Sequence, residues 1–161
     1  MQLRTVAAGL CALGGLCGAP AQAADFVAIA QEVTIARPPE AVWKQVGGFC
    51  AIWVQMRAPC EIVSGKDGEV GAVRRVGRTE EVLVAQTAWS HTYAQPKSPI
   101  DYHGTIEVRP ADGGKSSTLV YTLLYDAGPL ETAEAKAADR QRRAALFKRV
   151  LETAKAAAEK P

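Results

Sequence analysis

The longest regular pattern of apolar and polar positions lies at the end of the chain, between Leu130 and Lys160. Apolar residues recur there in steps of three, four and seven, which predicts one amphipathic helix. The predicted inner stripe consists of Ala133, Ala137, Ala144, Phe147, Leu151, Ala154 and Ala158, widened by Leu146 and Val150. Charged residues, Arg143 among them, fall on the opposite, solvated side. The first half of the stripe holds only alanine, so that half either packs closely against its partner or leaves a space there.

Most of the remaining chain alternates between apolar and polar residues, a period that predicts β-strands. Turn residues separate the strands, such as the loop from Gly65 to Gly68. The predicted strands are residues 26–36, 60–64, 70–76, 80–86, 89–95, 101–109 and 117–125. Between the first two strands, residues 40–46 and 49–56 predict two short helices, the first opened by Pro38-Pro39.

This order of elements predicts an α+β fold. Successive hairpins imply an antiparallel sheet with one buried face, and the terminal helix is the only large element available to cover that face. We therefore expect an antiparallel sheet of about seven strands wrapped around a long C-terminal helix, with two short helices after strand 1. A chain of 161 residues is long enough to form one such domain with a proper core.

The first 23 residues have a different character, which predicts a signal peptide. Arg4 precedes an apolar run from Val6 to Ala19, and Ala21-Gln22-Ala23 forms a cleavage signal. An uncleaved anchor is the alternative, although the run is shorter than the roughly 20 residues of a membrane span. Cys11 and Cys17 each follow leucine, which speaks against a lipoprotein. We expect a periplasmic or secreted protein, with a domain at residues 24–161 and no stable membrane span after cleavage.

Composition and cysteine spacing exclude several function classes. The net charge of +2 lacks the basic surplus of a protein that binds nucleic acid. The gap between Cys50 and Cys60 is not C-x-x-C, so neither a redox motif nor a zinc site is indicated. In an oxidising compartment the two cysteines predict a disulfide, and a pair of buried free thiols is the alternative. We find no catalytic motif and no histidine pair at metal spacing, and expect no cofactor.

Several short segments resemble the START-like (SRPBCC) superfamily, in particular its polyketide cyclase/dehydrase-like branch, which is related in fold to the birch pollen allergens. They are Val33-Thr34-Ile35-Ala36, Pro39-Glu40-Ala41-Val42-Trp43, Gly71-Ala72-Val73-Arg74, Glu81-Val82-Leu83 and Tyr93. Gly48-Phe49-Cys50-Ala51-Ile52, ahead of Trp53 and Cys60, is similar to an exported subgroup with two cysteines. This chain has Trp53-Val54-Gln55-Met56-Arg57 where that subgroup has a Trp-His-Pro-like run. The resemblance implies a helix-grip fold, with a cavity between sheet and terminal helix, and implies ligand binding more than catalysis.

The candidate ligand-binding residues are those whose polar tips could enter such a cavity. They are Trp53, Arg74, Glu81, Trp89, His91, Tyr93, Tyr102, Tyr121 and Tyr125. Mostly apolar sites with a few placed polar groups are typical of ligand pockets. The alternative is a filled core in which each buried hydroxyl finds a backbone partner.

Arg74 and Glu81 are included because they occupy positions of the family's motifs. If both face inward they should pair, since a lone buried charge is too costly; an exposed cross-strand ion pair is the alternative. His103 lies on the polar face of its strand, and we expect it at the surface.

These observations lead to one main functional hypothesis and two alternatives. The main hypothesis is an exported protein that binds a small hydrophobic or amphipathic molecule without changing it. The first alternative is a cyclase or dehydratase that uses Arg74, Glu81, His91 and the tyrosines. The second is a protein-interaction module whose core is filled. A cavity would favour either of the first two, and a perturbed acid or base inside it would favour the enzyme.

Overall fold

The computed structural model describes residues 24–160. The elements in chain order are β1 (Phe26–Ile35), α1 (Pro39–Val46), α2 (Ala51–Gln55), β2 (Cys60–Ser64), β3 (Val73–Val76), β4 (Thr79–Thr87), β5 (Ser90–Ala94), β6 (His103–Ala111), the single 3-10 turn η1 (Asp112–Gly114), β7 (Ser116–Asp126) and α3 (Ala133–Ala158). The predicted signal peptide lies outside the described residues and stays a prediction. None of the helices within residues 24–160 is long and apolar enough to cross a membrane.

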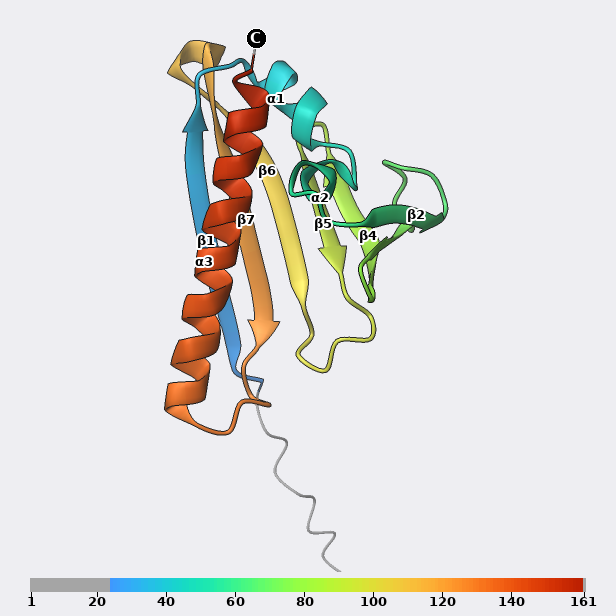
Figure 1. Ribbon diagram of the computed structural model, residues 1–161, viewed down its shortest axis with the longest axis vertical. Coiled ribbons are helices and arrows are strands. Elements are labelled where there is room, and N and C mark those ends of the chain that lie inside the picture. Colours follow the sequence, from blue (N-terminus) through green and yellow to red (C-terminus); the bar gives the residue numbers. More distant parts are fainter. Residues whose placement is uncertain (1–23, 161) are drawn as a thin grey trace, which may run out of the picture.

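The strands form a single seven-stranded sheet in the order β1-β7-β6-β5-β4-β3-β2. Neighbouring strands are antiparallel throughout. The connection from β1 to β2, which carries α1 and α2, crosses from one edge of the sheet to the other. The helix α3 lies along β1 and β7 on one side of the curved sheet (Figure 1). The predicted fold class is therefore confirmed.

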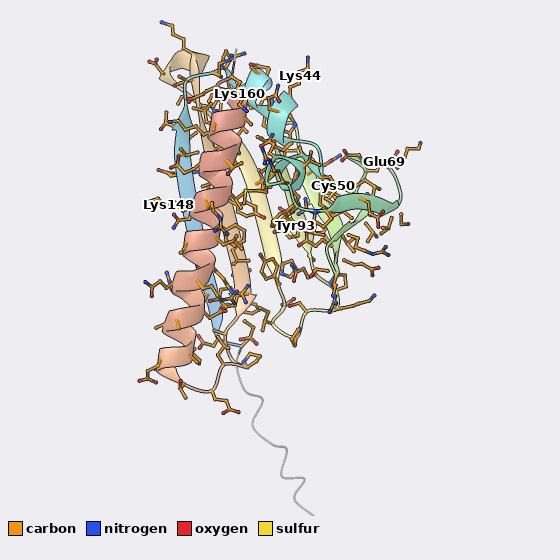
Figure 2. All side chains as sticks on the ribbon, in the orientation of Figure 1. Lys44, Cys50, Glu69, Tyr93, Lys148 and Lys160 are labelled. Atoms are coloured by element: carbon orange, nitrogen blue, oxygen red, sulfur yellow. A yellow bond between two sulfur atoms is a disulfide. The ribbon has the colours of Figure 1, made fainter. Side chains whose placement is uncertain are left out.

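The alternation expected for the last two strands is present. Ile106 and Val108 of β6 are buried, and so are Leu119, Tyr121, Leu123 and Tyr125 of β7. Gly104 has a special place in β6 because a Cβ there would lie 2.4 Å from the Tyr93 ring. Its cross-strand partner is Tyr93 itself, so the missing side chain makes room for a large aromatic ring. Tyr93 lies inside the protein whereas Lys148 lies at its surface (Figure 2).

The second half of α3 packs on the sheet as its sequence predicts. Phe147, Val150, Leu151 and Ala154 are all at most 2% exposed. The interpretation of the first half was wrong, because Ala133 and Ala137 are exposed.

The inner face of the first half of α3 instead carries polar residues. It passes through Lys136, Asp139 and Arg143, which are all partly buried. These positions lead into Phe147 by helical steps of three and four residues. A methyl group gains little from burial, so the alanines do not determine which side of the helix faces the sheet.

Several strand boundaries also differ from the prediction, most of all at the start of β3. Residues 70–72 do not belong to β3, because Gly71 has φ = 94°, a conformation that interrupts a strand, and Val70 is exposed. Trp89 lies in the turn between β4 and β5, although its ring still packs against the core.

Cys50 and Cys60 form a disulfide, as predicted, with their Cα atoms 5.6 Å apart. The bond joins the residue before α2 to the first residue of β2, at the free edge of the sheet. It therefore ties the helical crossover to the strand that follows it, and excludes the alternative of two free thiols.

Candidate functional site

A cavity of about 210 Å³ lies between the sheet and α3. It is lined by Trp53, Val76, Thr79, Glu81, Gln95, Tyr102, Arg143, Leu146 and Phe147. These residues come from α2, the β3–β4 hairpin, the β5–β6 connection and the middle of α3, so only the folded chain brings them together. The volume is below the roughly 300–1,000 Å³ usual for pockets of drug-sized ligands, which suits a compact molecule or one end of a longer one.

The deepest polar group of the cavity is Glu81, which pairs with Arg74 on the neighbouring strand. Arg74 is 1% exposed and Glu81 3% exposed. Both the Nε and the Nη2 atoms of Arg74 lie 2.6 Å from Oε2 of Glu81. The other carboxylate oxygen, Oε1, accepts a hydrogen bond of 2.8 Å from the Gln95 amide. Glu81 therefore reaches the cavity with both oxygens already engaged, and Arg74 lies behind it.

Aromatic rings and a backbone carbonyl complete the surroundings of Arg74. Its guanidinium carbon lies 4.2 Å from the centre of the Phe49 ring and 4.5 Å from that of Tyr93, so the cation packs in the corner formed by two aromatic rings. Nη1 donates to the carbonyl oxygen of Phe49. Arg74 and Glu81 therefore face the interior of the protein, and the charge of each is neutralised by the other. The alternative of an exposed ion pair across the strands is excluded.

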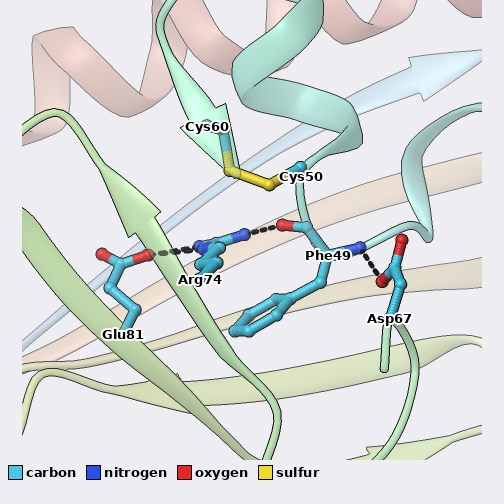
Figure 3. Close-up of a disulfide and its surroundings, with 6 residues drawn as sticks. All are labelled: Phe49, Cys50, Cys60, Asp67, Arg74 and Glu81. Carbon is cyan, nitrogen blue, oxygen red and sulfur yellow. Dashed lines mark hydrogen bonds and ion pairs between the residues drawn. A yellow bond between two sulfur atoms is a disulfide. The ribbon is translucent and has the colours of Figure 1, made fainter. Parts of the chain in front are cut away.

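The Cys50–Cys60 disulfide lies next to the Phe49 segment that contacts Arg74 (Figure 3). Phe49 directly precedes Cys50, and its backbone N–H donates to Asp67 at 2.8 Å. The segment that supplies a carbonyl and a ring to Arg74 is therefore held by a covalent bond on one side and by the β2–β3 loop on the other. Trp53, which lines the cavity, belongs to the short helix that begins next to this bond.

At the opposite side of the cavity, Arg143 extends from α3 over two tyrosines. Its guanidinium carbon lies 4.5 Å from the centre of the Tyr125 ring and 5.6 Å from that of Tyr102. Nε donates to Oδ2 of Asp139 at 2.6 Å, and Arg142 also donates to Asp139. Burial raises the pKa of Asp139, but the hydrogen bonds from Arg143 and Arg142 outweigh this effect and leave that pKa lowered. The carboxylate thus stays ionised between two arginines.

The remaining candidates belong to the core and do not themselves line the cavity. Tyr93 and Tyr121 join their hydroxyl groups in a hydrogen bond, and the Tyr121 ring lies 4.3 Å from that of Phe147. Burial raises the pKa of both hydroxyls, so they stay protonated. Trp89 packs against the core from its turn, and Tyr125 lies under Arg143.

His91 lies near Trp43 and Phe49, with ring centres 5.7 and 5.6 Å away. Burial, reinforced by the charge of Arg74, lowers its pKa to about 4, and the imidazole is neutral near pH 7. His103, expected at the surface, is about one-third exposed, with Nδ1 3.1 Å from the carbonyl oxygen of Asp101.

Of the predicted ligand-binding residues, Trp53, Glu81 and Tyr102 line the cavity, and Arg74 contacts it through Glu81. Arg143 was assigned to the solvated face of the helix, and this assignment was wrong. Its spacing of four residues from Phe147 places the two side chains on one side of a helix, a signal that could have identified it. Gln95, which follows β5, and Thr79, the first residue of β4, carried no comparable signal, because only tertiary structure brings them to the site.

A profile of the family described as "polyketide cyclase / dehydrase and lipid transport" matches residues 27–159. The chain belongs to this family. The resemblance inferred from the short motifs is thereby confirmed at the level of the family. Among curated proteins, none matches the sequence significantly.

Solved structures share the fold of this member of the polyketide cyclase/dehydrase family. A protein from Nitrosospira multiformis is 19% identical, with a TM-score of 0.67 over 81% of this chain and 94% of its own. An uncharacterized protein from Bacillus thuringiensis is 19% identical, with a TM-score of 0.63 over 83% of this chain and 100% of its own. Ara h 8.0201 is 16% identical, with a TM-score of 0.58 over 83% of this chain and 97% of its own. At these identities the likeness shows the helix-grip fold alone.

Proposed function

We propose that this protein binds a small hydrophobic or amphipathic molecule in the cavity between the sheet and α3. The observation that carries this proposal is the cavity itself, a half-open hollow between the sheet and α3 beside a well-filled core. Trp53, Val76, Leu146 and Phe147 offer apolar surface, and Thr79, Glu81, Gln95, Tyr102 and Arg143 offer polar groups, so the wall is divided about evenly between the two. The wall is more polar than that of most small-molecule sites, which suits an amphipathic molecule better than a purely apolar one. The family's description, which includes lipid transport, supports the same function.

The proposal includes export of the mature protein to the periplasm or the cell exterior. The leader-like first 23 residues support export, and the disulfide is consistent with an oxidising compartment. Cell fractionation followed by mass spectrometry of the N-terminus tests this part. Protein that keeps residues 1–23 and stays in the cytosolic fraction would contradict it.

Binding can be tested on protein isolated from its own compartment. Native mass spectrometry should find a bound small molecule, which solvent extraction after denaturation releases for identification. Adding the extracted molecule back should raise the melting temperature with its concentration, because it binds the folded state alone.

A matched pair of variants separates the cavity from the rest of the surface. Leu146→Trp places a large ring at the cavity wall and should abolish the ligand-dependent rise in melting temperature. Val54→Trp makes a similar change on α2 at a position that is 60% exposed, and should leave that rise intact.

The alternative functions predict other outcomes. Turnover of an aromatic polyketide-like substrate, lost in Glu81→Gln without loss of folding, would indicate a cyclase or dehydratase. Isolated protein that carries no small molecule and shows no thermal shift with lipids, sterols or aromatic polyketides would indicate an interaction module.

A further inference from the structure

We propose that the cavity selects an amphiphile with a carboxylate head, which Arg143 binds at the mouth of the site. This inference rests on the proposed function and adds the chemical class of the ligand. The apolar body of the molecule would lie against Trp53, Leu146 and Phe147.

The charge balance around Arg143 is the first observation. Two arginines, Arg142 and Arg143, share the single carboxylate of Asp139, which leaves one positive charge uncompensated within the cluster. Arg142 is 68% exposed and can be neutralised by solvent, whereas Arg143 is 17% exposed. The partly buried cation is therefore the one that gains most from a further anion.

The hydrogen bonds of Arg143 are the second observation. Within residues 24–160, its hydrogen bond to a protein group is made by Nε, to Asp139. Its terminal nitrogens remain available, and the side chain lines the cavity. A guanidinium presents parallel N–H groups that match the two oxygens of a carboxylate.

The charge at the opposite end of the cavity also favours a ligand whose anionic head lies at Arg143. Glu81 is a carboxylate whose two oxygens already accept hydrogen bonds from Arg74 and Gln95. An anionic head placed there would meet a like charge and find its neighbouring cation already engaged. The head must therefore point toward Arg143.

Tyr102 adds a neutral aromatic wall beside Arg143. Its ring lies 5.6 Å from the guanidinium carbon, and the residue lines the cavity. Burial raises the pKa of Tyr102 to about 12, so its hydroxyl keeps its proton at neutral pH and adds no negative charge that would repel an anionic head.

A neighbouring hollow suggests how an anion approaches. This hollow, of about 350 Å³, shares Thr79 and Gln95 with the cavity and is also lined by Arg78, Lys97 and Glu80. Lys97 pairs with Glu80, but Arg78 forms no ion pair within the described part of the chain. The two hollows together present more positive than negative groups, which would raise the local concentration of anions.

Two probes of one carbon skeleton test the head group: 4-phenylbutyrate and 4-phenylbutan-1-ol. Isothermal titration calorimetry on the mature, disulfide-bonded protein should give the carboxylate an affinity about tenfold higher than that of the alcohol, as expected for a charge-assisted contact in a partly buried site. The advantage should shrink as salt is added.

Arg143→Gln should remove the preference for the carboxylate and leave alcohol binding nearly unchanged. Arg142→Gln is the matched control, because it removes an adjacent arginine that binds the same Asp139 but does not line the cavity. It should keep the preference. If Arg143→Gln does not fold, Arg143→Lys preserves the charge without the paired donors and should retain a reduced preference.

The outcomes separate the head-group proposal from the proposed function. If the unaltered protein binds the alcohol as tightly as the carboxylate, the head-group proposal is wrong and cavity binding stands. If Arg142→Gln loses the preference as fully as Arg143→Gln, the effect is general surface charge and the proposal is also wrong. If neither probe binds at millimolar concentration, both the head-group proposal and binding of compact amphiphiles in this cavity fail together.

Discussion

Replacing Arg74 by methionine tests whether the buried ion pair holds this side of the fold together. The substitution keeps an unbranched apolar chain against the Phe49 and Tyr93 rings but removes the charge. It leaves Glu81, only 3% exposed, with Gln95 as its one remaining hydrogen-bond partner among the residues described. Removing one member of a buried pair costs about 3–5 kcal/mol, because the other charge stays desolvated and uncompensated.

Arg75→Met is the matched control for this substitution. Arg75 is the next residue along β3, faces solvent and is 44% exposed, with ion pairs to Glu61 and Glu80 at 3.0 and 3.2 Å. Exposed pairs of this kind contribute about 0–1 kcal/mol. The same chemical change one position along the strand should therefore have several-fold different consequences.

Urea denaturation followed by circular dichroism measures both free energies of unfolding on the oxidised protein. A loss of about 3–5 kcal/mol in Arg74→Met should lower the melting temperature by roughly 10–20 °C in a domain of this size. The double variant Arg74→Met, Glu81→Leu should recover part of the loss, since no unpaired charge remains. Equal stability losses in Arg74→Met and Arg75→Met would refute the reasoning, as would a double variant less stable than the sum of its two single changes.

Three further predictions concern other parts of the fold. Reducing the Cys50–Cys60 disulfide, which closes a loop with a sequence separation of 10, should lower the free energy of unfolding by about 2.5–3 kcal/mol, and an unchanged urea midpoint in reductant would contradict this. Leu151→Ala should lower the free energy of unfolding by about 2–5 kcal/mol, because it empties a buried site. Ala137→Leu, at an exposed position, should change that free energy by no more than about 0.5 kcal/mol. A large loss of melting temperature in Ala137→Leu would mean that the first half of α3 is packed against the sheet. The pKa of His91 is lowered to about 4 in the folded protein. As the pH falls from about 6.5 toward 4, the unfolded chain therefore binds a proton at this residue that the folded protein does not bind. The free energy of unfolding should decline by up to about 3 kcal/mol across that window. His91→Gln should flatten this slope while His103→Gln should not, and equal slopes in all three proteins would exclude His91 as the cause.

The secondary structure followed well from the sequence where large apolar residues repeat. The buried series in β6 and β7 and the anchors Phe147 and Leu151 were all predicted, because each large side chain commits its position to one face. Prediction failed where side chains are small or the backbone is unusual. Ala133 and Ala137 were assigned to the inner face of α3 but are exposed, and Gly71 breaks the strand expected at residues 70–76.

The candidate site was only partly predictable. Family motif positions pointed to Arg74 and Glu81, and the preference of buried charges for partners predicted that they would pair if they faced inward. The faces themselves depended on β-sheet register, which places Arg74 opposite Glu81 and next to the free edge of the sheet. Tyr93 and Tyr121 are joined through their hydroxyl groups within the core whereas Tyr102 lines the cavity, a difference that only tertiary packing decides.

The sequence by itself determined the order of elements, the antiparallel sheet, the long terminal helix and the pairing of Cys50 with Cys60. These features depend on local periodicity, turn residues and the small number of available partners. The tertiary structure alone decided where the sheet and α3 part to leave a cavity, and that Arg143, Gln95 and Thr79 meet Glu81 around it. The physical reason is that a cavity is set by the difference between the space enclosed by packed elements and the volume of their side chains. That difference depends on helix rotation and strand register, which involve residues far apart in the chain.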